Sequence, residues 1–103
     1  MRVGRLVQGY RKISMYFVYV LQSVKDGNFY IGFTKDVKKR FNDHVGGKNT
    51  STECRLPLKL IYYEAHCSKE DALRRENYFK TSKGKTTLHQ ILREYLAQSI
   101  TEL

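Results

Sequence analysis

Residues 16–34 read YFVYVLQSVKDGNFYIGFT and indicate two β-strands joined by a tight turn. Apolar side chains occupy both alternating faces over residues 16–22, which is typical of a strand that is covered on both sides. The turn falls at residues 25–28, where Asp-Gly favours the positive φ angles of a tight hairpin. On the returning strand, Tyr30 and Gly32 share one face, and the apolar residues around them share the other. The stretch therefore predicts an antiparallel β-hairpin.

Periodicity and capping signals predict a helix, a third strand and two more helices after the hairpin. These segments run from a cap at Thr34 or Asp36 to about Val45, over Leu58 to Ala65, from Ser68 to about Ser82, and over Thr86 to Ala97. Asp71 lies three residues after Ser68, which matches a capping box. Gly46 and Gly84 act as stop signals for the first two helices. The order predicts an α+β fold, with a three-stranded, mostly antiparallel sheet and helices packed on it.

Apolar residues at helical spacing mark the helix faces that we expect to be buried. In the first helix these residues are Val37, Phe41 and Val45, beside a polar stripe of Asp36, Arg40 and His44. In the last helix they are Leu88, Ile91, Leu92, Tyr95 and Leu96.

The length of 103 residues suits one domain with one hydrophobic core. We place this domain at residues 15–97, between an N-terminal extension over 1–14, expected to be flexible, and a tail over 98–103. Apolar residues make up 41% of the chain, too many for a disordered protein. No apolar run approaches the roughly 20 residues of a membrane helix. Cys54 and Cys67 fit neither a disulfide framework nor a zinc pattern, so we expect reduced thiols in a cytoplasmic protein.

The charge of the chain favours a polyanionic partner. There are 19 basic and 10 acidic residues, which give a formal charge of +9. The first fourteen residues contribute four of the cations and no acid, so the remainder keeps 15 basic against 10 acidic residues, or +5. An excess of this kind is typical of proteins that bind nucleic acid. A basic protein without such a partner is the alternative, and charge alone does not separate the two.

Glu76 is the carboxylate that most strongly indicates a site. Its spacing from Ala72, Leu73 and Phe79 places it within the stripe of its helix that faces the core. A carboxylate there is costly unless it is paired or bound to a metal, and a single carboxylate suits Mg²⁺, which often keeps most of its waters. The alternative is an ordinary surface pair with Lys80, one helical turn later.

Four further residues could act on a phosphate group. Arg40 offers a planar fork of donors, and His44, one turn later, could orient a water or protonate a leaving oxygen. Tyr19 and Tyr30 lie near the facing ends of the two strands, but a phenol is a poor base at neutral pH unless nearby cations assist it. Each of these residues alone could equally be a surface or packing residue.

Taken together, these residues resemble the GIY-YIG nuclease family. The matching segments are Phe17-Val18-Tyr19, Tyr30-Ile31-Gly32, Lys39-Arg40, His44 and Arg75-Glu76. The resemblance covers about residues 15–97 and is closest in appearance to small stand-alone bacterial members. Phe17 and Val18 stand where the family name has glycine and isoleucine. The late polar residue that many members use is not identifiable, and Thr81, Ser82 and Lys83 are the candidates for it.

The resemblance implies a sheet-and-helix nuclease fold and cleavage of DNA that depends on Mg²⁺ or Mn²⁺, in repair or recombination. At the matching positions, Glu76 would hold the metal and Arg40 would stabilise charge on the phosphate. Tyr19 would act as general base or position the attacking water, and Tyr30 and His44 would assist through hydrogen bonds or proton transfer. The residues expected to contact nucleic acid are Lys35, Lys38, Lys39, Lys48 and Arg75.

Two main functions stay open at this point, and an RNA-directed or repair-associated role through the same phosphate contacts is a third. The first is a metal-dependent endonuclease, indicated by the joint presence of the five candidate catalytic residues. The second is a nucleic-acid-binding module of the same fold without catalysis, indicated by the basic charge and the many tyrosines. Because no second DNA-binding module is recognisable, specificity would come from the basic face or from a protein partner.

Overall fold

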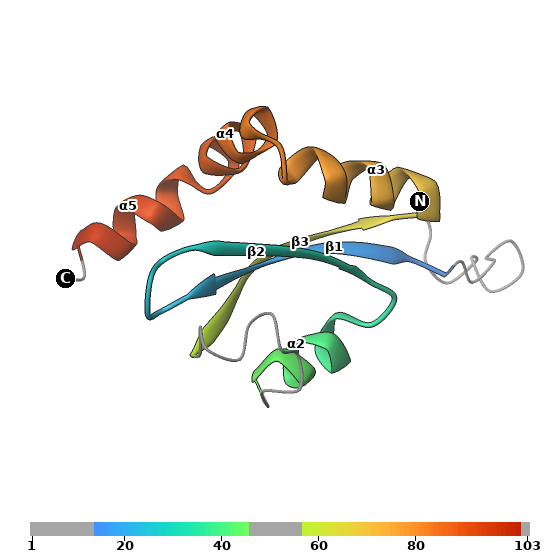
Figure 1. The fold of residues 1–103 in the computed structure, drawn as a ribbon, viewed down its shortest axis with the longest axis horizontal. Coiled ribbons are helices and arrows are strands. Elements are labelled where there is room, and N and C mark those ends of the chain that lie inside the picture. Colours follow the sequence, from blue (N-terminus) through green and yellow to red (C-terminus); the bar gives the residue numbers. More distant parts are fainter. Residues whose placement is uncertain (1–13, 46–56, 102–103) are drawn as a thin grey trace, which may run out of the picture.

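The computed structural model describes residues 14–45 and 57–101 of the chain. In chain order the elements are β1 (Tyr16–Ser23), β2 (Phe29–Thr34), α2 (Val37–Val45), β3 (Leu58–His66), α3 (Lys69–Phe79), α4 (Ser82–Ile91) and α5 (Arg93–Thr101). Figure 1 shows a sheet with α2 on one side and the later helices on the other. The predicted α+β class is confirmed, and so is the predicted order of elements as far as α3, but two helices, α4 and α5, follow α3 where one was predicted.

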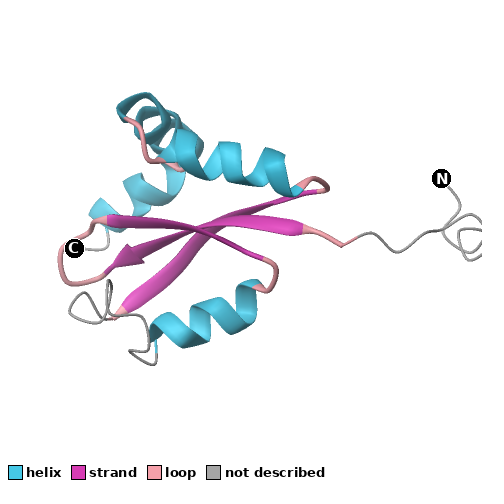
Figure 2. Ribbon diagram, turned by 45° about the vertical axis from the view of Figure 1, so that its right-hand side comes forward, coloured by secondary structure: helices cyan, strands magenta, loops and turns pink. Residues whose placement is uncertain are grey.

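Strand β1 lies at the centre of the sheet and pairs antiparallel with β2 on one side and with β3 on the other. Helical layers cover both faces, as Figure 2 shows. This position explains why β1 is apolar on both faces, since most of a central strand between two layers is shielded from water. The β1–β2 register places Tyr19 opposite Gly32, and a register shift between Val20 and Leu21 interrupts the pairing with β3.

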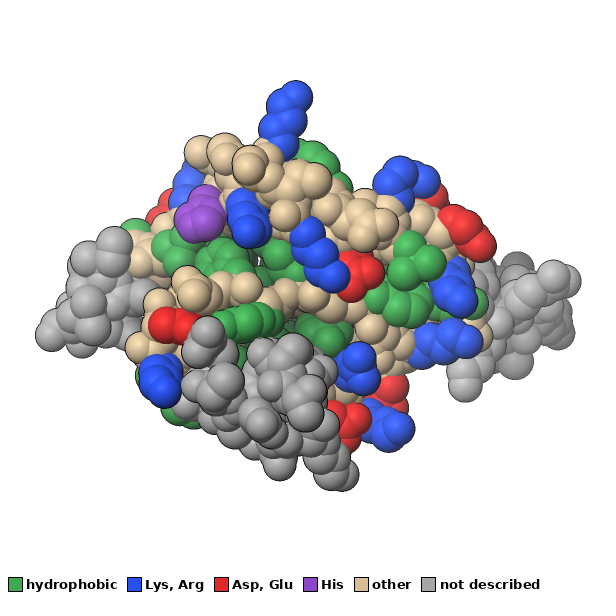
Figure 3. Space-filling view, in the orientation of Figure 1, with side chains coloured by type: hydrophobic (Ala, Val, Ile, Leu, Met, Phe, Trp, Pro, Cys, Tyr) green, Lys and Arg blue, Asp and Glu red, His purple; other side chains and the backbone are tan. Residues whose placement is uncertain are grey.

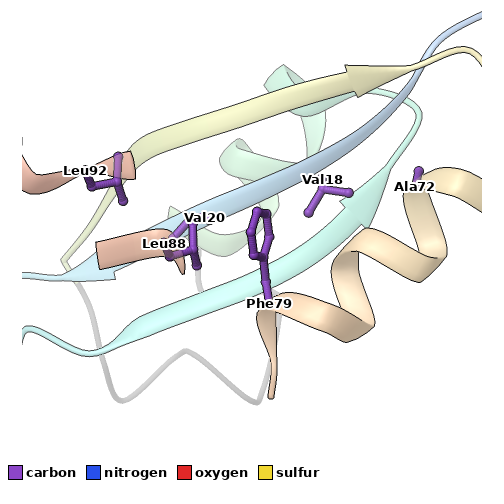
Figure 4. Close-up of a cluster of buried hydrophobic side chains, with 6 residues drawn as sticks. All are labelled: Val18, Val20, Ala72, Phe79, Leu88 and Leu92. Carbon is purple, nitrogen blue, oxygen red and sulfur yellow. The ribbon is translucent and has the colours of Figure 1, made fainter. Parts of the chain in front are cut away.

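Two buried clusters lie on opposite faces of the sheet. The cluster under α3 and α4 contains Val18, Val20, Ala72, Phe79, Leu88 and Leu92, which Figure 4 draws together. The cluster on the α2 face contains Tyr19, Leu21 and Leu58, with Tyr30, Phe41 and Leu60 packed against it. The alternation along β1 and β2 therefore divides the side chains between the faces as the sequence predicts.

The corner between α3 and α4 differs from the prediction. Helix α3 ends at Phe79 rather than near Ser82, and Gly84 lies inside the first turn of α4 instead of stopping a helix. The physical reason is close packing, because a β-carbon at Gly84 would overlap the backbone carbonyl of Tyr78. Thr81 caps α4, and its Oγ1 accepts a hydrogen bond from the Gly84 amide at 3.0 Å.

The C-terminal region is kinked where the sequence predicted one helix over residues 86–97. The α4–α5 break falls at Leu92, although Leu92 N–H still donates to the Leu88 carbonyl at 2.9 Å. The bend keeps Leu96 against the buried cluster while α5 follows the sheet. Ile91 is 42% exposed, so it does not belong to the predicted buried face. Helix α5 runs to Thr101 and thus includes most of the segment assigned to a tail.

Two further predictions concern the ends of segments. Ser68 is the N-cap residue of α3, but its side chain makes no capping hydrogen bond, so the predicted capping box is wrong. Its hydroxyl instead donates to the Glu70 carboxylate at 3.2 Å. The predicted extension lies outside the described residues except for its last residue, and so does the glycine stop at Gly46.

Within the described part of the chain, no helix has the length and apolar character needed to cross a membrane.

Candidate active site

Tyr19 is held across the face of the sheet by the glycine opposite it. The phenol lies directly over Gly32 on the paired strand, where a β-carbon would overlap the phenol oxygen and ring. Tyr19 is only 4% exposed and belongs to the buried cluster on the α2 face. Gly32 is therefore needed for close approach of a side chain rather than for an unusual backbone angle, because Gly27 is the only described glycine with positive φ.

On the expectation that Tyr19 takes part in DNA cleavage, replacing Gly32 by alanine should lower turnover about tenfold or more, because the added methyl group displaces the Tyr19 phenol from its position. Cleavage rates of the variant and of Tyr19→Phe test this, with thermal unfolding as a check of the fold. In the Tyr19→Phe background, the Gly32 substitution should cause little additional loss of rate. Additive losses would show that Gly32 acts through another residue.

Arg40 reaches the same phenol from α2. Its Nε donates to the Tyr19 hydroxyl oxygen at 3.4 Å. The start of α2 is set by Asp36, whose Oδ1 accepts from the Lys39 amide at 3.0 Å, and by Thr34, whose hydroxyl accepts from the Asp36 amide at 3.0 Å. Of the two predicted caps, Asp36 is the one that bonds to the first turn of the helix. These hydrogen bonds fix the residue at which α2 begins. The start of the helix in turn places Arg40 beside the Tyr19 hydroxyl.

A hollow of about 520 Å³ runs beside edge strand β2, and we call it the edge groove. Its polar lining residues are Tyr19, Tyr30, Arg40, Glu76, Lys80 and Lys85. Figure 3 shows this face of the molecule, where basic side chains border a hollowed, partly apolar surface between the upper helices and the strands. The structure therefore brings together four of the five candidate catalytic residues. The fifth, His44, lies on α2, but its side chain is outside the described part of the structure.

Glu76 projects into the edge groove from α3. Its side chain is 16% exposed, and Lys80 Nζ lies 3.2 Å from its Oε2. The Glu76–Lys80 pair considered as an alternative thus exists, but it lines the groove instead of lying on an open surface. Lys80 is 53% exposed, so its ammonium group can move away from the carboxylate without unfolding the helix.

Lys80 and Lys85 are groove residues that the sequence analysis did not assign to the site. The three late candidates, Thr81, Ser82 and Lys83, are exposed and do not line the groove. Thr81 is used instead as the cap of α4. Lys80 follows Glu76 by four residues, and this spacing could have predicted that Lys80 lies beside Glu76 in the groove. No local signal pointed to Lys85, because its position depends on the packed corner at Gly84.

The predicted nucleic-acid contacts fall into three groups. Lys38 and Lys39 are exposed on α2, and Lys35 lies over the Tyr16 ring, 5.7 Å from its centroid. Lys48 lies outside the described residues. Arg75 does not line the edge groove, because its Nε donates to Glu64 Oε1 at 2.7 Å.

Arg75 belongs to a polar network between α3 and β3. The Glu64 carboxylate accepts from Tyr62 at 2.7 Å and lies 3.0 Å from His66 Nε2. The Arg75 guanidinium also lies over the Phe79 ring, 4.4 Å from its centroid. Burial disfavours the charged form of Glu64, but hydrogen bonds from Tyr62, Arg75 and His66 outweigh it and lower the pKa of Glu64. Burial and the neighbouring carboxylate raise the pKa of Tyr62 to about 12.

Glu64→Gln is expected to lower the free energy of unfolding at neutral pH by about 1–2 kcal/mol, because charge-assisted hydrogen bonds are lost. The lowered pKa of Glu64 gives stability that is present above the ordinary carboxyl pKa of 4.5 and is lost as the pH falls through the folded value. The difference between parent and variant should therefore shrink below pH 4.5. Urea unfolding across this range measures it, and a constant difference would contradict the assignment.

The donor set of the edge groove fits a divalent cation bound largely through water. Glu76 is the only carboxylate among the described residues that line the groove. The described residues hold no group of three or more His, Cys, Asp or Glu side chains arranged for a metal. Mg²⁺ typically takes one or two carboxylates and keeps several waters, whereas structural zinc requires four protein ligands. The residues present therefore suit Mg²⁺ or Mn²⁺.

Comparison with known proteins identifies the family of this chain. Residues 15–89 match the family model of the GIY-YIG catalytic domain, and the chain belongs to the GIY-YIG family of nucleases. Its relatives include bacterial UPF0213 proteins. One from Streptococcus agalactiae serotype V is 49% identical over 65 residues, which span 62% of this chain and 73% of the relative. One from Limosilactobacillus reuteri is 52% identical over 68 residues, which span 63% and 70%.

A solved structure is also similar. The solution NMR structure of a UPF0213 protein from Bacillus halodurans is 36% identical, with a TM-score of 0.48, and the match covers 75% of this chain and 84% of that chain.

Proposed function

We propose that this protein is a divalent-metal-dependent endonuclease that hydrolyses phosphodiester bonds of DNA, with a role in repair or recombination. The observation that carries the proposal is the convergence of Tyr19, Tyr30, Arg40 and Glu76 on one groove. These residues come from four elements, β1, β2, α2 and α3, and meet only in the fold. Membership of a nuclease family supports the same conclusion.

Glu76 would hold Mg²⁺ or Mn²⁺ in the edge groove. When bound, such a cation supplies positive charge to a phosphoryl oxygen and makes water a better nucleophile. The low exposure of Glu76 fits this role, since a mostly buried carboxylate is costly without a cationic partner. Lys80 would be the cationic partner of Glu76 when no metal is bound. When a metal is bound, the Lys80 ammonium group would turn to the substrate.

Arg40 and Tyr19 would act together on the phosphate and the attacking water. The Arg40 Nε–H points at the Tyr19 oxygen, which leaves the other guanidinium donors for phosphate oxygens. Tyr19 would position the attacking water or accept its proton. Fixed donors of this kind stabilise the charge that develops in the transition state without reorganising. Tyr30 and His44 would assist through hydrogen bonds or proton transfer.

Binding of the DNA backbone would rest on the cations around the groove. Lys80 and Lys85 line it, and Lys35, Lys38 and Lys39 follow β2 on the α2 side. Neutralising phosphates releases counterions, so affinity should fall steeply with salt. Contacts of this kind carry little sequence information, and a protein partner would supply any further specificity.

Cleavage of labelled DNA tests the proposal. The metal-stripped protein would be offered duplex, branched and single-stranded DNA with Mg²⁺, with Mn²⁺, or with chelator. Products should appear only with metal, and the Arg40→Ala variant, purified in parallel, should produce far fewer. Equal activity of this variant would identify a contaminating nuclease. Salt-sensitive binding without cleavage in either metal would reject the proposal and favour a non-catalytic binding module.

A further inference from the structure

A second hollow of about 410 Å³ adjoins the edge groove at the β1–β2 turn, and we call it the hairpin hollow. It is lined by Gly27, Asn28, Phe29, Tyr30, Lys85 and His89. Phe29, Tyr30 and Lys85 line both hollows. The two therefore form one continuous surface, and a polymer that lies in the edge groove can continue into the hairpin hollow.

An aromatic pair forms one wall of the hairpin hollow. The rings of Phe29 and His89 are stacked, with centroids 5.3 Å apart and planes inclined by 24°. Phe29 packs against the buried cluster under α4, whereas His89 is exposed. The His89 ring thus extends a fixed aromatic stack from the core towards solvent.

The orientation of the His89 ring is fixed by a second contact. Its Nδ1 lies 2.7 Å from the backbone carbonyl oxygen of Lys85, one turn earlier on α4. A carbonyl can only accept, so Nδ1 carries the proton and donates. A ring that is held on one face and at one edge loses little freedom when a flat ligand stacks on it.

Lys85 supplies a cation at the junction of the two hollows. It lines both, while the ion pairs found among the described residues do not include it. No acidic side chain among the described residues lines the hairpin hollow. An aromatic platform with a cation beside it matches the two parts of a nucleotide, a flat base and a phosphate.

We propose that the hairpin hollow is a nucleotide subsite, in which an unpaired base stacks on His89 and its phosphate binds Lys85. The inference rests on the proposed nuclease function and adds the substrate class, DNA with an unpaired nucleotide next to the scissile phosphate. Bases inside a continuous duplex are stacked on one another and cannot occupy this site without being extruded. The substrate is therefore single-stranded or branched DNA rather than continuous duplex.

A fluorescence titration tests the subsite without cleavage. Short single-stranded DNA carrying a fluorescent purine analogue is titrated with protein in the presence of chelator. Binding should change the fluorescence of the stacked base, and His89→Ala should weaken binding about fivefold or more, the loss expected for one stacked base. His89→Phe keeps a ring and should retain most of the affinity. Gln90→Ala, at the exposed neighbouring position of α4, should bind like the parent.

Three results would overturn the subsite. The first is equal affinity of His89→Ala and the parent for single-stranded DNA. The second is an equal loss of affinity for continuous duplex, which would indicate general weakening. The third comes from the parent protein alone. DNA that lacks one base should bind more weakly than intact DNA, and equal affinity at every position of the missing base would exclude stacking even if the His89 variants fail to fold.

The same experiments separate this inference from the proposed function. If DNA is not cleaved in any metal but the His89 and missing-base results hold, the nuclease assignment fails and the nucleotide subsite stands. If DNA is cleaved with metal but His89→Ala binds and cleaves single-stranded DNA like the parent, the subsite fails and the nuclease assignment stands.

Discussion

Glu76→Gln should lower the turnover number by about a hundredfold to a thousandfold, the scale of losing one group that stabilises transition-state charge. Glutamine keeps the shape of the side chain but removes the charge that would hold a divalent cation in the edge groove. The free energy of unfolding should change by less than about 1 kcal/mol, because the Lys80 partner is half exposed and such pairs contribute little. The substitution therefore separates chemistry from folding.

Single-turnover cleavage over a range of Mg²⁺ concentrations measures this effect. The expected signature is a large fall in rate together with weaker dependence on Mg²⁺, and Mn²⁺ binding to the parent and the variant provides a readout without catalysis. Glu70→Gln is the matched control, since Glu70 is an exposed carboxylate in the first turn of the same helix and does not line the groove. If Glu76→Gln cleaves and binds metal like the parent, Glu76 is not the metal ligand.

Gly84→Ala should destabilise the protein by about 2 kcal/mol or more, the range found for overpacked sites. Helix propensity alone predicts the opposite sign, because alanine is favoured over glycine inside a helix by about 1 kcal/mol. Packing should win, since the new β-carbon overlaps the Tyr78 carbonyl and the α-carbon of Phe79. These atoms belong to the backbone of α3, which cannot move aside as a flexible side chain could. The α3–α4 corner would have to open.

Thermal and urea unfolding show whether Gly84→Ala lowers the free energy of unfolding, as packing predicts, or raises it, as helix propensity predicts. A loss of about 2 kcal/mol corresponds to a fall in melting temperature of about 10 °C for a domain of this size. Lys83→Ala is the control, because Lys83 is an exposed residue in the same helical turn, and its stability should stay within about 0.5 kcal/mol of the parent. A Gly84→Ala protein that is as stable as the parent would show that the corner yields at little cost.

The hairpin and the order of elements could be predicted from the sequence because their signals are local. Alternation along β1 and β2 and the Asp-Gly turn specify two paired strands, and the structure has them with Gly27 at φ 75°. The opposition of Tyr19 and Gly32 follows from that register. The convergence of Arg40 and Glu76 on the edge groove was expected from the family resemblance, since no local rule brings α2 and α3 to the same edge of a sheet.

The α3–α4 corner could not be predicted, because its cause is a contact between two helices. Gly84 reads as a stop signal in the sequence, yet its role is to let α4 approach the Tyr78 carbonyl. The kink at Leu92 has a similar origin in packing against the sheet. The position of Lys85 in the groove depends on this corner, so no local pattern in the sequence marks it as a groove residue.

Arg75 shows a second limit of sequence reasoning. Neighbouring positions on a helix project about 100° apart, so Arg75 and Glu76 cannot both face the same groove. Arg75 binds Glu64, which shares the α3 side of β3 with Tyr62 and His66. A carboxylate on the buried side of a strand requires a cationic partner. This requirement of Glu64 was the signal that could have predicted an ion pair with Arg75.

The placement of Tyr19 in the buried cluster ties its proposed catalytic role to the integrity of the whole domain. Its neighbours Leu21 and Leu58 are core residues of the central and outer strands, so in the parent protein the phenol keeps its packed surroundings until the sheet itself comes apart. Loss of activity on heating should therefore coincide with cooperative melting, with no active, partly unfolded species. Adaptation to new substrates would have to come from the exposed lysines at the rim, since the floor of the groove cannot be altered without weakening the molecule.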